Sequence, residues 1–159
     1  MKETIRIGNC SGFYGDRLAA AKEMVEGGPI DVLTGDYLAE LTMKILYDQR
    51  EQRGAHMGYV GTFLKQLEDV VELCMARGIK IVTNAGGLNS AGMAVEVERI
   101  LQEKGVTAKV AYIDGDDLMP ELSALQADGE AFVNIDQNRP LSECENEVVT
   151  ANTYFGAWS

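Results

Sequence analysis

Polar and glycine-rich turns carry most of the residues that could bind a ligand or move a proton. Each follows an apolar run of strand length, and they span residues 8–16, 35–36, 84–89 and 114–117. If the strands are parallel, their carboxyl ends lie at one edge of the sheet, which is where open α/β sheets bind ligands. The turns therefore predict a shared ligand site at that edge.

The first turn could hold an anionic ligand group through its backbone. Its glycines fit neither the GxGxxG nor the Walker A pattern, but backbone amides at a helix start can bind an oxyanion. We expect ligand contacts from Gly8, Asn9, Ser11, Gly12, Gly15 and Asp16. The alternative is a tight strand–helix connection without a ligand. Asp16 is expected to be the N-cap of the helix that follows, and Arg17 could support an anion or lie in solvent.

The turn at 84–89 follows the clearest strand of the sequence and contains two asparagines around a glycine pair. Amide side chains supply donors and acceptors of fixed geometry. This favours ligand contacts, to a carbonyl or carboxylate, from Asn84, Gly86, Gly87 and Asn89. The alternative is turn formation alone, because Asn and Gly both tolerate left-handed backbone. Ser90 is expected to cap the helix that follows this turn.

Acidic residues follow two of the expected strands, and Asp36 and Asp116 are the candidate acid–base catalysts. Asp114, Asp116 and Asp117 could instead bind a divalent cation. Their spacing differs from that of an EF-hand loop, and acidic residues are common at helix starts. No metal site is assigned, and the sequence leaves the cofactor unknown.

Cys10 and His56 are weaker candidates. A helix N-terminus next to Cys10 is expected to lower the pKa of its thiol, but no partner base is evident nearby. His56 is the only histidine, and a single loop histidine is more often a bystander than a general base.

Short apolar strands alternate with longer amphipathic helices along the chain. Strands are expected at 4–8, 30–34, 79–84 and 106–113, with a weaker one at 131–135, and helices at 16–26, 37–53, 62–77, 90–104 and 114–125. Strands separated by helices of this length pair in parallel. The pattern predicts a doubly wound, mostly parallel α/β sheet with helices on both faces, Rossmann-like, in a single domain over 1–159.

Composition excludes several classes of protein. The 159 residues are 46% apolar and 25% charged, which is typical of a folded domain. Fourteen basic and 25 acidic residues give a net charge of −11, which argues against nucleic-acid binding. No apolar run reaches the roughly 18 residues needed to span a membrane. Three widely spaced cysteines without a CxxC pair indicate a reducing compartment, so we expect a cytoplasmic protein.

Five ordered motifs resemble the acyclic terpene utilisation AtuA-like family. They comprise residues 8–17, 36–40, 78–89, 115–118 and 151–158, and span nearly the whole chain. The resemblance implies a role in bacterial breakdown of branched terpenoid acids as CoA thioesters. Family proteins are several hundred residues long, so we expect this chain to correspond to their N-terminal part and its fold to be incomplete at the C-terminus.

Three functions are consistent with these observations, the third being a metal-dependent hydrolase or lyase that uses Asp114, Asp116 and Asp117. The first is an enzyme or enzyme subunit of terpenoid or branched-chain acyl-CoA catabolism, a lyase, hydratase or hydrolase that acts on an acyl-CoA or hydroxy acid. The second is a non-catalytic ligand-binding or assembly subunit that supports a partner enzyme. In each case we expect a small-molecule ligand and an apolar surface patch. We also expect a homo-oligomer, or association with another chain or with a missing C-terminal region.

Overall fold

The computed structural model describes residues 4–154 of the chain. The chain divides into two compact units, one that ends at Ile113 and one that begins at Asp114. Each unit is described by itself. The expectation of a single domain over 1–159 stays a prediction. Among residues 4–154, none of the helices combines the length and apolarity that a membrane-spanning segment requires.

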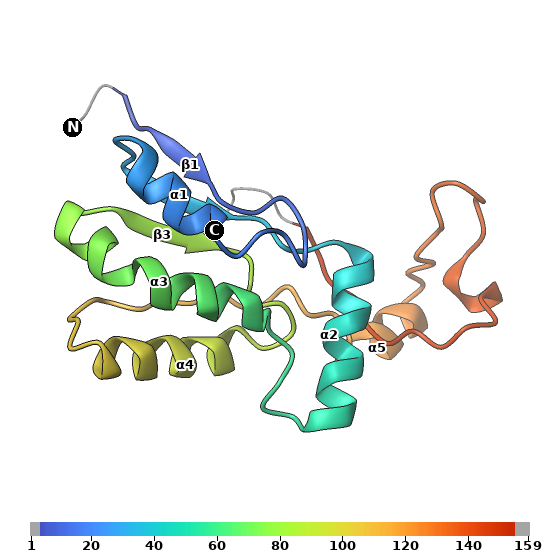
Figure 1. The fold of residues 1–159 in the computed structure, drawn as a ribbon. Coiled ribbons are helices and arrows are strands. Elements are labelled where there is room, and N and C mark those ends of the chain that lie inside the picture. The colour runs from blue at the N-terminus through green and yellow to red at the C-terminus, as the bar shows by residue number, and fades with distance from the viewer. Residues whose placement is uncertain (1–3, 155–159) are drawn as a thin grey trace. The chain divides into compact units, whose positions relative to one another are not determined.

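The first unit is an α/β structure with a three-stranded parallel sheet in the order β1-β2-β3 (Figure 1). Its strands are β1 (Ile7–Asn9), β2 (Val32–Gly35) and β3 (Lys80–Thr83). Its helices are α1 (Ala20–Gly27), α2 (Glu40–Arg53), α3 (Gly61–Arg77) and α4 (Ser90–Glu103). Parallel neighbours need crossover connections, which α1 supplies between β1 and β2 and α2 with α3 between β2 and β3. The predicted α/β class is confirmed.

Helices α1 and α3 pack against each other and against one face of this sheet (Figure 1). Two crossovers of the same hand that advance in the same direction place their helices on the same face. Leu33 of β2 faces them and is buried with Val25 of α1 and Val70 and Cys74 of α3. A second apolar cluster joins α2, α3 and α4 through Leu46, Phe63, Leu67 and Ile100. The apolar faces read from the sequence therefore form this core.

The opposite face of the sheet is open. Ile7 is 65% exposed and Val82 is 58% exposed, although both lie in strands. The register places two rows on this face, Ile7–Val32–Lys80 and Asn9–Thr34–Val82. A doubly wound sheet carries helices on both faces, and its strand order reverses. Among the described residues the sheet has three strands and no reversal, so the predicted double winding is not confirmed.

Two predicted strands are wrong. Residues 106–113 are extended but form no ladder; Val106 and Val110 pack against the α2–α4 cluster, while Tyr112 and Ile113 are exposed. Residues 131–135 are irregular, and Phe132 has a φ of 46°. In both segments the β-branched and aromatic residues indicated a strand, but strand formation also requires a neighbour that accepts its hydrogen bonds.

Two predicted caps are also wrong. Helix α1 begins at Ala20 rather than next to Asp16, and its N-cap residue, Ala19, makes no side-chain cap. The cap of α4 is Asn89, whose side chain accepts a hydrogen bond from the Gly92 amide, whereas Ser90 is the first helical residue. Asn and Ser are both good N-caps, so the sequence alone did not distinguish neighbouring positions.

The second unit is small and has little regular structure. It contains α5 (Leu122–Ala127), a 3-10 turn at Leu141–Glu143 and an isolated antiparallel bridge between Asp117 and Asn152. None of residues 114–154 is buried. The bridge, with the Leu118 amide donating to the Ala151 carbonyl at 2.8 Å, holds the beginning of this unit against residues near its end.

Gly87 lies where the turn after β3 approaches the loop between α2 and α3. Its φ is +52°, and a Cβ there would lie 2.8 Å from the Gly58 carbonyl oxygen and overlap Leu46. The same carbonyl accepts a hydrogen bond from the Leu88 amide at 2.7 Å. Glycine is therefore required for close packing at this position, whatever the turn binds.

Gly87→Ala should lower the free energy of unfolding by about 2–3 kcal/mol, through left-handed strain and overpacking. Urea titration followed by helical circular dichroism measures the change. Gly61→Ala at the start of α3 is the matched control, since a Cβ there meets nothing within 4 Å. Equal stability of the two variants would contradict this account of Gly87.

Candidate functional site

The three strands end at one edge, where polar side chains link neighbouring ends. The Thr34 hydroxyl of β2 donates to Asn9 Oδ1 at 3.2 Å, just where β1 ends. Asn84, which follows β3, donates through Nδ2 to Asp36 Oδ1, after β2, at 2.7 Å. The structure therefore brings Asn9, Asp36 and Asn84 to one exposed polar margin of the sheet, which we call the strand-end edge.

Asp36 is held in place while part of its carboxylate stays accessible. Oδ1 accepts the Asn84 bond and a longer one, 3.4 Å, from the Leu38 amide. Within residues 4–154, Oδ2 has no hydrogen-bond partner, and the residue is exposed. Asn84 is itself fixed, because its Oδ1 accepts from the Tyr37 amide at 2.9 Å. An oriented carboxylate with one accessible oxygen can act as a general base or bind a hydroxyl group.

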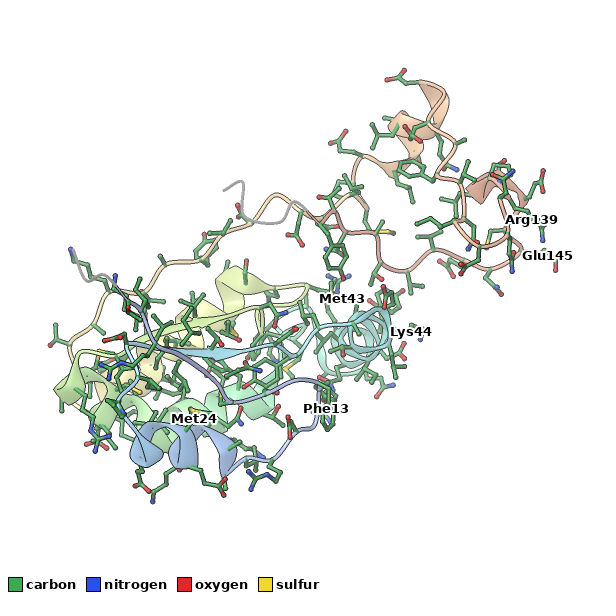
Figure 2. All side chains as sticks on the ribbon, turned by 90° about the horizontal axis from the view of Figure 1, so that it is seen from above. Phe13, Met24, Met43, Lys44, Arg139 and Glu145 are labelled. Carbon is green, nitrogen blue, oxygen red and sulfur yellow. The ribbon has the colours of Figure 1, made fainter. Side chains whose placement is uncertain are left out.

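The first turn supplies its own anion. Asp16 Oδ2 accepts from the Gly12 amide at 3.0 Å, and Oδ1 accepts from the Arg17 amide at 2.7 Å. These bonds lower the pKa of Asp16 below its ordinary value, the Gly12 bond most. The carboxylate thus occupies amides that an anionic ligand would use, so such a ligand would have to displace it. Phe13 projects from this turn and is 60% exposed (Figure 2).

Other polar groups of the first turn are used within it. Asn9 Nδ2 donates to the Ser11 carbonyl at 2.8 Å, and the buried Ser11 hydroxyl donates to the Phe13 carbonyl at 3.0 Å. Gly12 and Gly15 are open, since a Cβ at either would meet nothing within 4 Å, and Gly15 has a φ of +90°. The backbone near these two glycines is therefore the accessible part of this turn.

Four of the expected ligand residues have structural roles. A Cβ at Gly8 would lie 2.7 Å from Met24 of α1, and one at Gly86 would lie 2.9 Å from Ser90. Gly87 packs as described above. Asn89 caps α4 and also donates to the His56 and Met57 carbonyls at 3.1 and 3.2 Å. Packing and capping account for these residues, and their part in ligand binding stays a prediction.

Asp116 belongs to the second unit. Its Oδ2 accepts from Asn152 Nδ2 at 3.1 Å, and its carbonyl accepts from the Thr153 amide at 2.8 Å. The side chain therefore supports the bridge that closes this unit. No group of three His, Cys, Asp or Glu residues in the described part of the chain is arranged to hold a metal ion, which removes geometric support for the Asp114–Asp116–Asp117 alternative.

The sequence matches the model of a protein family over residues 5–159, and the family is described as acyclic terpene utilisation family protein AtuA. The chain belongs to this family. Membership indicates a role in acyclic terpene utilisation and confirms the resemblance drawn from the five motifs. No curated protein and no solved structure matches the chain.

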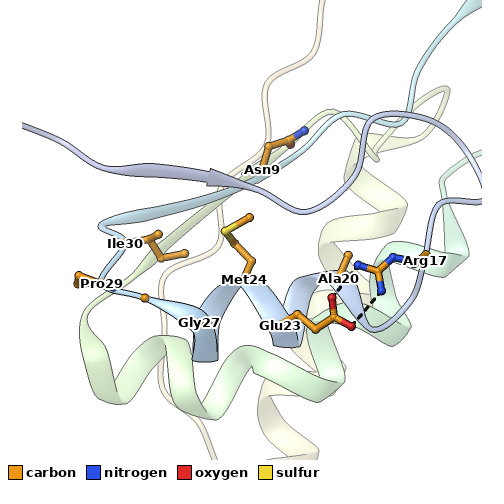
Figure 3. A pocket seen from close by; sticks show the side chains of 9 residues that line it. Asn9, Arg17, Ala20, Glu23, Met24, Gly27, Pro29 and Ile30 are labelled. Atoms are coloured by element: carbon orange, nitrogen blue, oxygen red, sulfur yellow. Dashed lines mark hydrogen bonds and ion pairs between the residues drawn. The ribbon is translucent and has the colours of Figure 1, made fainter.

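In this AtuA-family chain a hollow of about 420 Å³ lies between α1 and β1 (Figure 3). Met24, Pro29 and Ile30 contribute apolar walls, and Asn9 is the one expected ligand residue among those that line it. Arg17 lies at the rim, and its two terminal guanidinium nitrogens donate to the Glu23 carboxylate at 2.9 and 2.6 Å. This ion pair, drawn dashed in Figure 3, satisfies the cation that was a candidate for anion binding.

Tyr37 and Gln66 were not among the site residues predicted from the sequence. Both are buried, and the Tyr37 hydroxyl donates to Gln66 Oε1 beneath the first turn. Two signals were present: Gln66 interrupts the apolar face of α3, and Gly35 precedes Tyr37 by two residues. A Cβ at Gly35 would lie 2.6 Å from the Tyr37 ring, so the ring requires that glycine.

The expected activation of Cys10 is wrong. Its side chain is buried, and burial raises the pKa of the thiol above its ordinary value. Since α1 begins at Ala20, Cys10 is not at a helix N-terminus. Burial also raises the pKa of Cys74 to about 11. Cys144 is exposed, and His56 is exposed in the loop between α2 and α3.

When the native AtuA-family chain is treated with iodoacetamide at pH 8, we expect one cysteine to be alkylated rapidly and two slowly. Cys144 should react at the rate of a free thiol, whereas burial and raised pKa values should slow Cys10 and Cys74 at least about 100-fold. Peptide mass spectrometry gives each rate, and the urea-unfolded chain is the control. Fast alkylation of Cys10 in the native chain would show that the first turn is open.

Proposed function

We propose that this chain is an enzyme, or an enzyme subunit, of acyclic terpenoid or branched-chain acyl-CoA catabolism. Its ligand would bind over the strand-end edge, with Asp36 as the acid–base group. One observation carries the proposal: the Asp36 carboxylate is oriented by Asn84 at 2.7 Å and has an accessible oxygen at the edge where α/β sheets bind ligands.

The geometry supports a proton-transfer step. In a hydratase or lyase, Asp36 Oδ2 would take a proton from carbon next to the thioester carbonyl or from water; in a hydrolase it would activate water. The second Nδ2 hydrogen of Asn84 and the amides near Gly12 and Gly15 would orient the carbonyl. In the second unit Asp116 is the other proposed acid–base residue. The free thiols of the described residues support a reducing compartment, which we propose is the cytoplasm.

Thermal-shift titration with branched acyl-CoA esters tests binding, with free CoA and the free acids as controls. A saturable rise in melting temperature specific to the thioester is expected, because a ligand that binds only the folded state stabilises it by RT ln(1 + [L]/Kd). Hydration, hydrolysis and isomerisation of the thioester that binds would then be followed by mass spectrometry.

Asp36→Asn should lower turnover at least about 100-fold while the thermal shift persists, since the amide keeps an oxygen for Asn84 but cannot take a proton. Asn84→Ala should lower both turnover and, by about 1–2 kcal/mol, the free energy of unfolding, because it removes the bonds to Asp36 and the Tyr37 amide. Asp69→Asn on the exposed surface of α3 is the matched control. Wild-type binding and turnover in both site variants would refute the assignment.

The open sheet face favours a second candidate, a non-catalytic assembly subunit. Parallel sheets are nearly always covered on both faces, yet Ile7 and Val82 are more than half exposed. In this alternative a second copy or a partner chain covers the face, and its helices complete a doubly wound arrangement. The same face would then be unavailable to a ligand.

Sedimentation velocity over a range of protein concentrations tests the second candidate. Wild-type chain should associate, and Val82→Lys should abolish association because a buried, unpaired charge is costly. Val95→Lys is the matched control, since Val95 is 63% exposed on α4, away from the sheet face. A wild-type chain that stays monomeric at every concentration, or equal association of the two variants, would exclude this face as an interface between copies of the chain.

A further inference from the structure

Tyr37 connects the elements that carry the strand-end edge. It is 1% exposed and packs edge-to-face against Phe63 of α3, with ring centroids 6.0 Å apart. Its amide donates to Asn84 Oδ1, and its carbonyl accepts from the Thr42 hydroxyl of α2 at 3.0 Å. The residue therefore joins the end of β2 to β3, α2 and α3.

The Tyr37 hydroxyl extends these connections to the first turn. It donates to Gln66 Oε1, and Gln66 Nε2 donates to the Arg17 carbonyl at 3.1 Å, where the turn ends. Cys10 and Ser11, where the turn begins, lie beside the same hydroxyl. Burial first, and then the Cys10 thiol, raise the pKa of Tyr37, so the hydroxyl keeps the proton that it donates.

The turn is also tied to Asp36 through the backbone. The Asp36 amide donates to the Ser11 carbonyl at 3.0 Å, so a displacement of the turn is transmitted to the residue that carries the accessible carboxylate. Gln66 is 2% exposed, and within the described residues both of its polar atoms are satisfied by this arrangement. A buried, fully satisfied side-chain pair fixes one conformation of the elements it joins.

We propose that Tyr37 and Gln66 are a positioning pair that holds residues 10–17 of the first turn against α3 and thereby sets the position of the strand-end edge. Neither residue is a catalytic residue, because neither reaches the exposed edge. The inference goes beyond the proposed function and depends on it only for what the edge binds. It predicts that loss of the pair opens the turn locally while the rest of the core stays folded.

Alkylation of the two buried thiols distinguishes local from global opening in the full-length chain. Cys10 lies at the start of the turn, whereas Cys74 lies in α3 and belongs to the same buried cluster. Iodoacetamide at fixed pH and low extent of reaction, followed by peptide mass spectrometry, gives both rates in one sample. Local opening that exposes Cys10 should raise its rate in proportion to the open population.

Tyr37→Phe should raise the Cys10 alkylation rate about fivefold, the effect of one buried hydrogen bond, and leave the Cys74 rate unchanged. Gln66→Met removes the partner and should do the same, and the double variant should open little further than either single variant. Tyr59→Phe is the matched control, because Tyr59 is buried and its hydroxyl has no hydrogen-bond partner among residues 4–154.

Two results would overturn the proposal. If Cys10 and Cys74 accelerated equally in Tyr37→Phe and in Gln66→Met, the pair would contribute only global stability. If neither rate changed, the pair would not hold the turn. No ligand is present in this measurement, so a failure of the proposed function would appear separately, as the absence of any thermal shift with branched acyl-CoA esters.

Discussion

Both crossover connections advance in the same direction along the sheet, and the rest of the first unit depends on this constraint. Because β1, β2 and β3 follow one another in space as in sequence, α1 and α3 cover one face, and the strand ends meet at one edge. That arrangement buries Leu33 and leaves Ile7 and Val82 exposed. The polar margin of Asn9, Thr34, Asp36 and Asn84 thus borders a sheet face with exposed apolar side chains. Whether ligand or protein occupies that surface separates the two functions, since one face cannot serve both at once.

Glycine and asparagine illustrate how far a site can be predicted from sequence. The parallel strands, and hence a common edge, followed from alternating apolar runs and helices, and Asn84 and Asp36 do meet there. The sequence could not separate glycines that approach a ligand from glycines that approach another element. Gly8 and Gly86 exclude side chains that would collide with Met24 and Ser90, contacts that depend on helix packing. Gly12 and Gly15 show no such contact, so the space around them is open.

The errors in the fold have a related cause. Residues 106–113 contain the residue types of a strand, but a strand is defined by pairing, and this segment forms no ladder. Asp16 has the residue type of a helix cap, yet its carboxylate accepts from the Gly12 and Arg17 amides before the helix begins. Tyr37 and Gln66 were missed for the opposite reason, because a tyrosine and a glutamine 29 residues apart show no local pattern. In each case local residue type was informative, and the tertiary partner decided the outcome.

The negative charge of the chain determines which part of a ligand the strand-end edge could bind. The chain carries a net charge of −11, Asp16 already occupies amides of the first turn, and Arg17 is paired with Glu23 at 2.6 Å. The phosphates of a CoA thioester would meet an unfavourable field at this edge, since like charges repel and the adjacent cation is neutralised. A thioester carbonyl and a branched hydrocarbon carry no net charge and match the amide groups and the exposed Ile7 and Val82 side chains of the sheet face. In the proposed function the acyl group would therefore lie at the strand ends, and the nucleotide would extend away from them into solvent or to other residues.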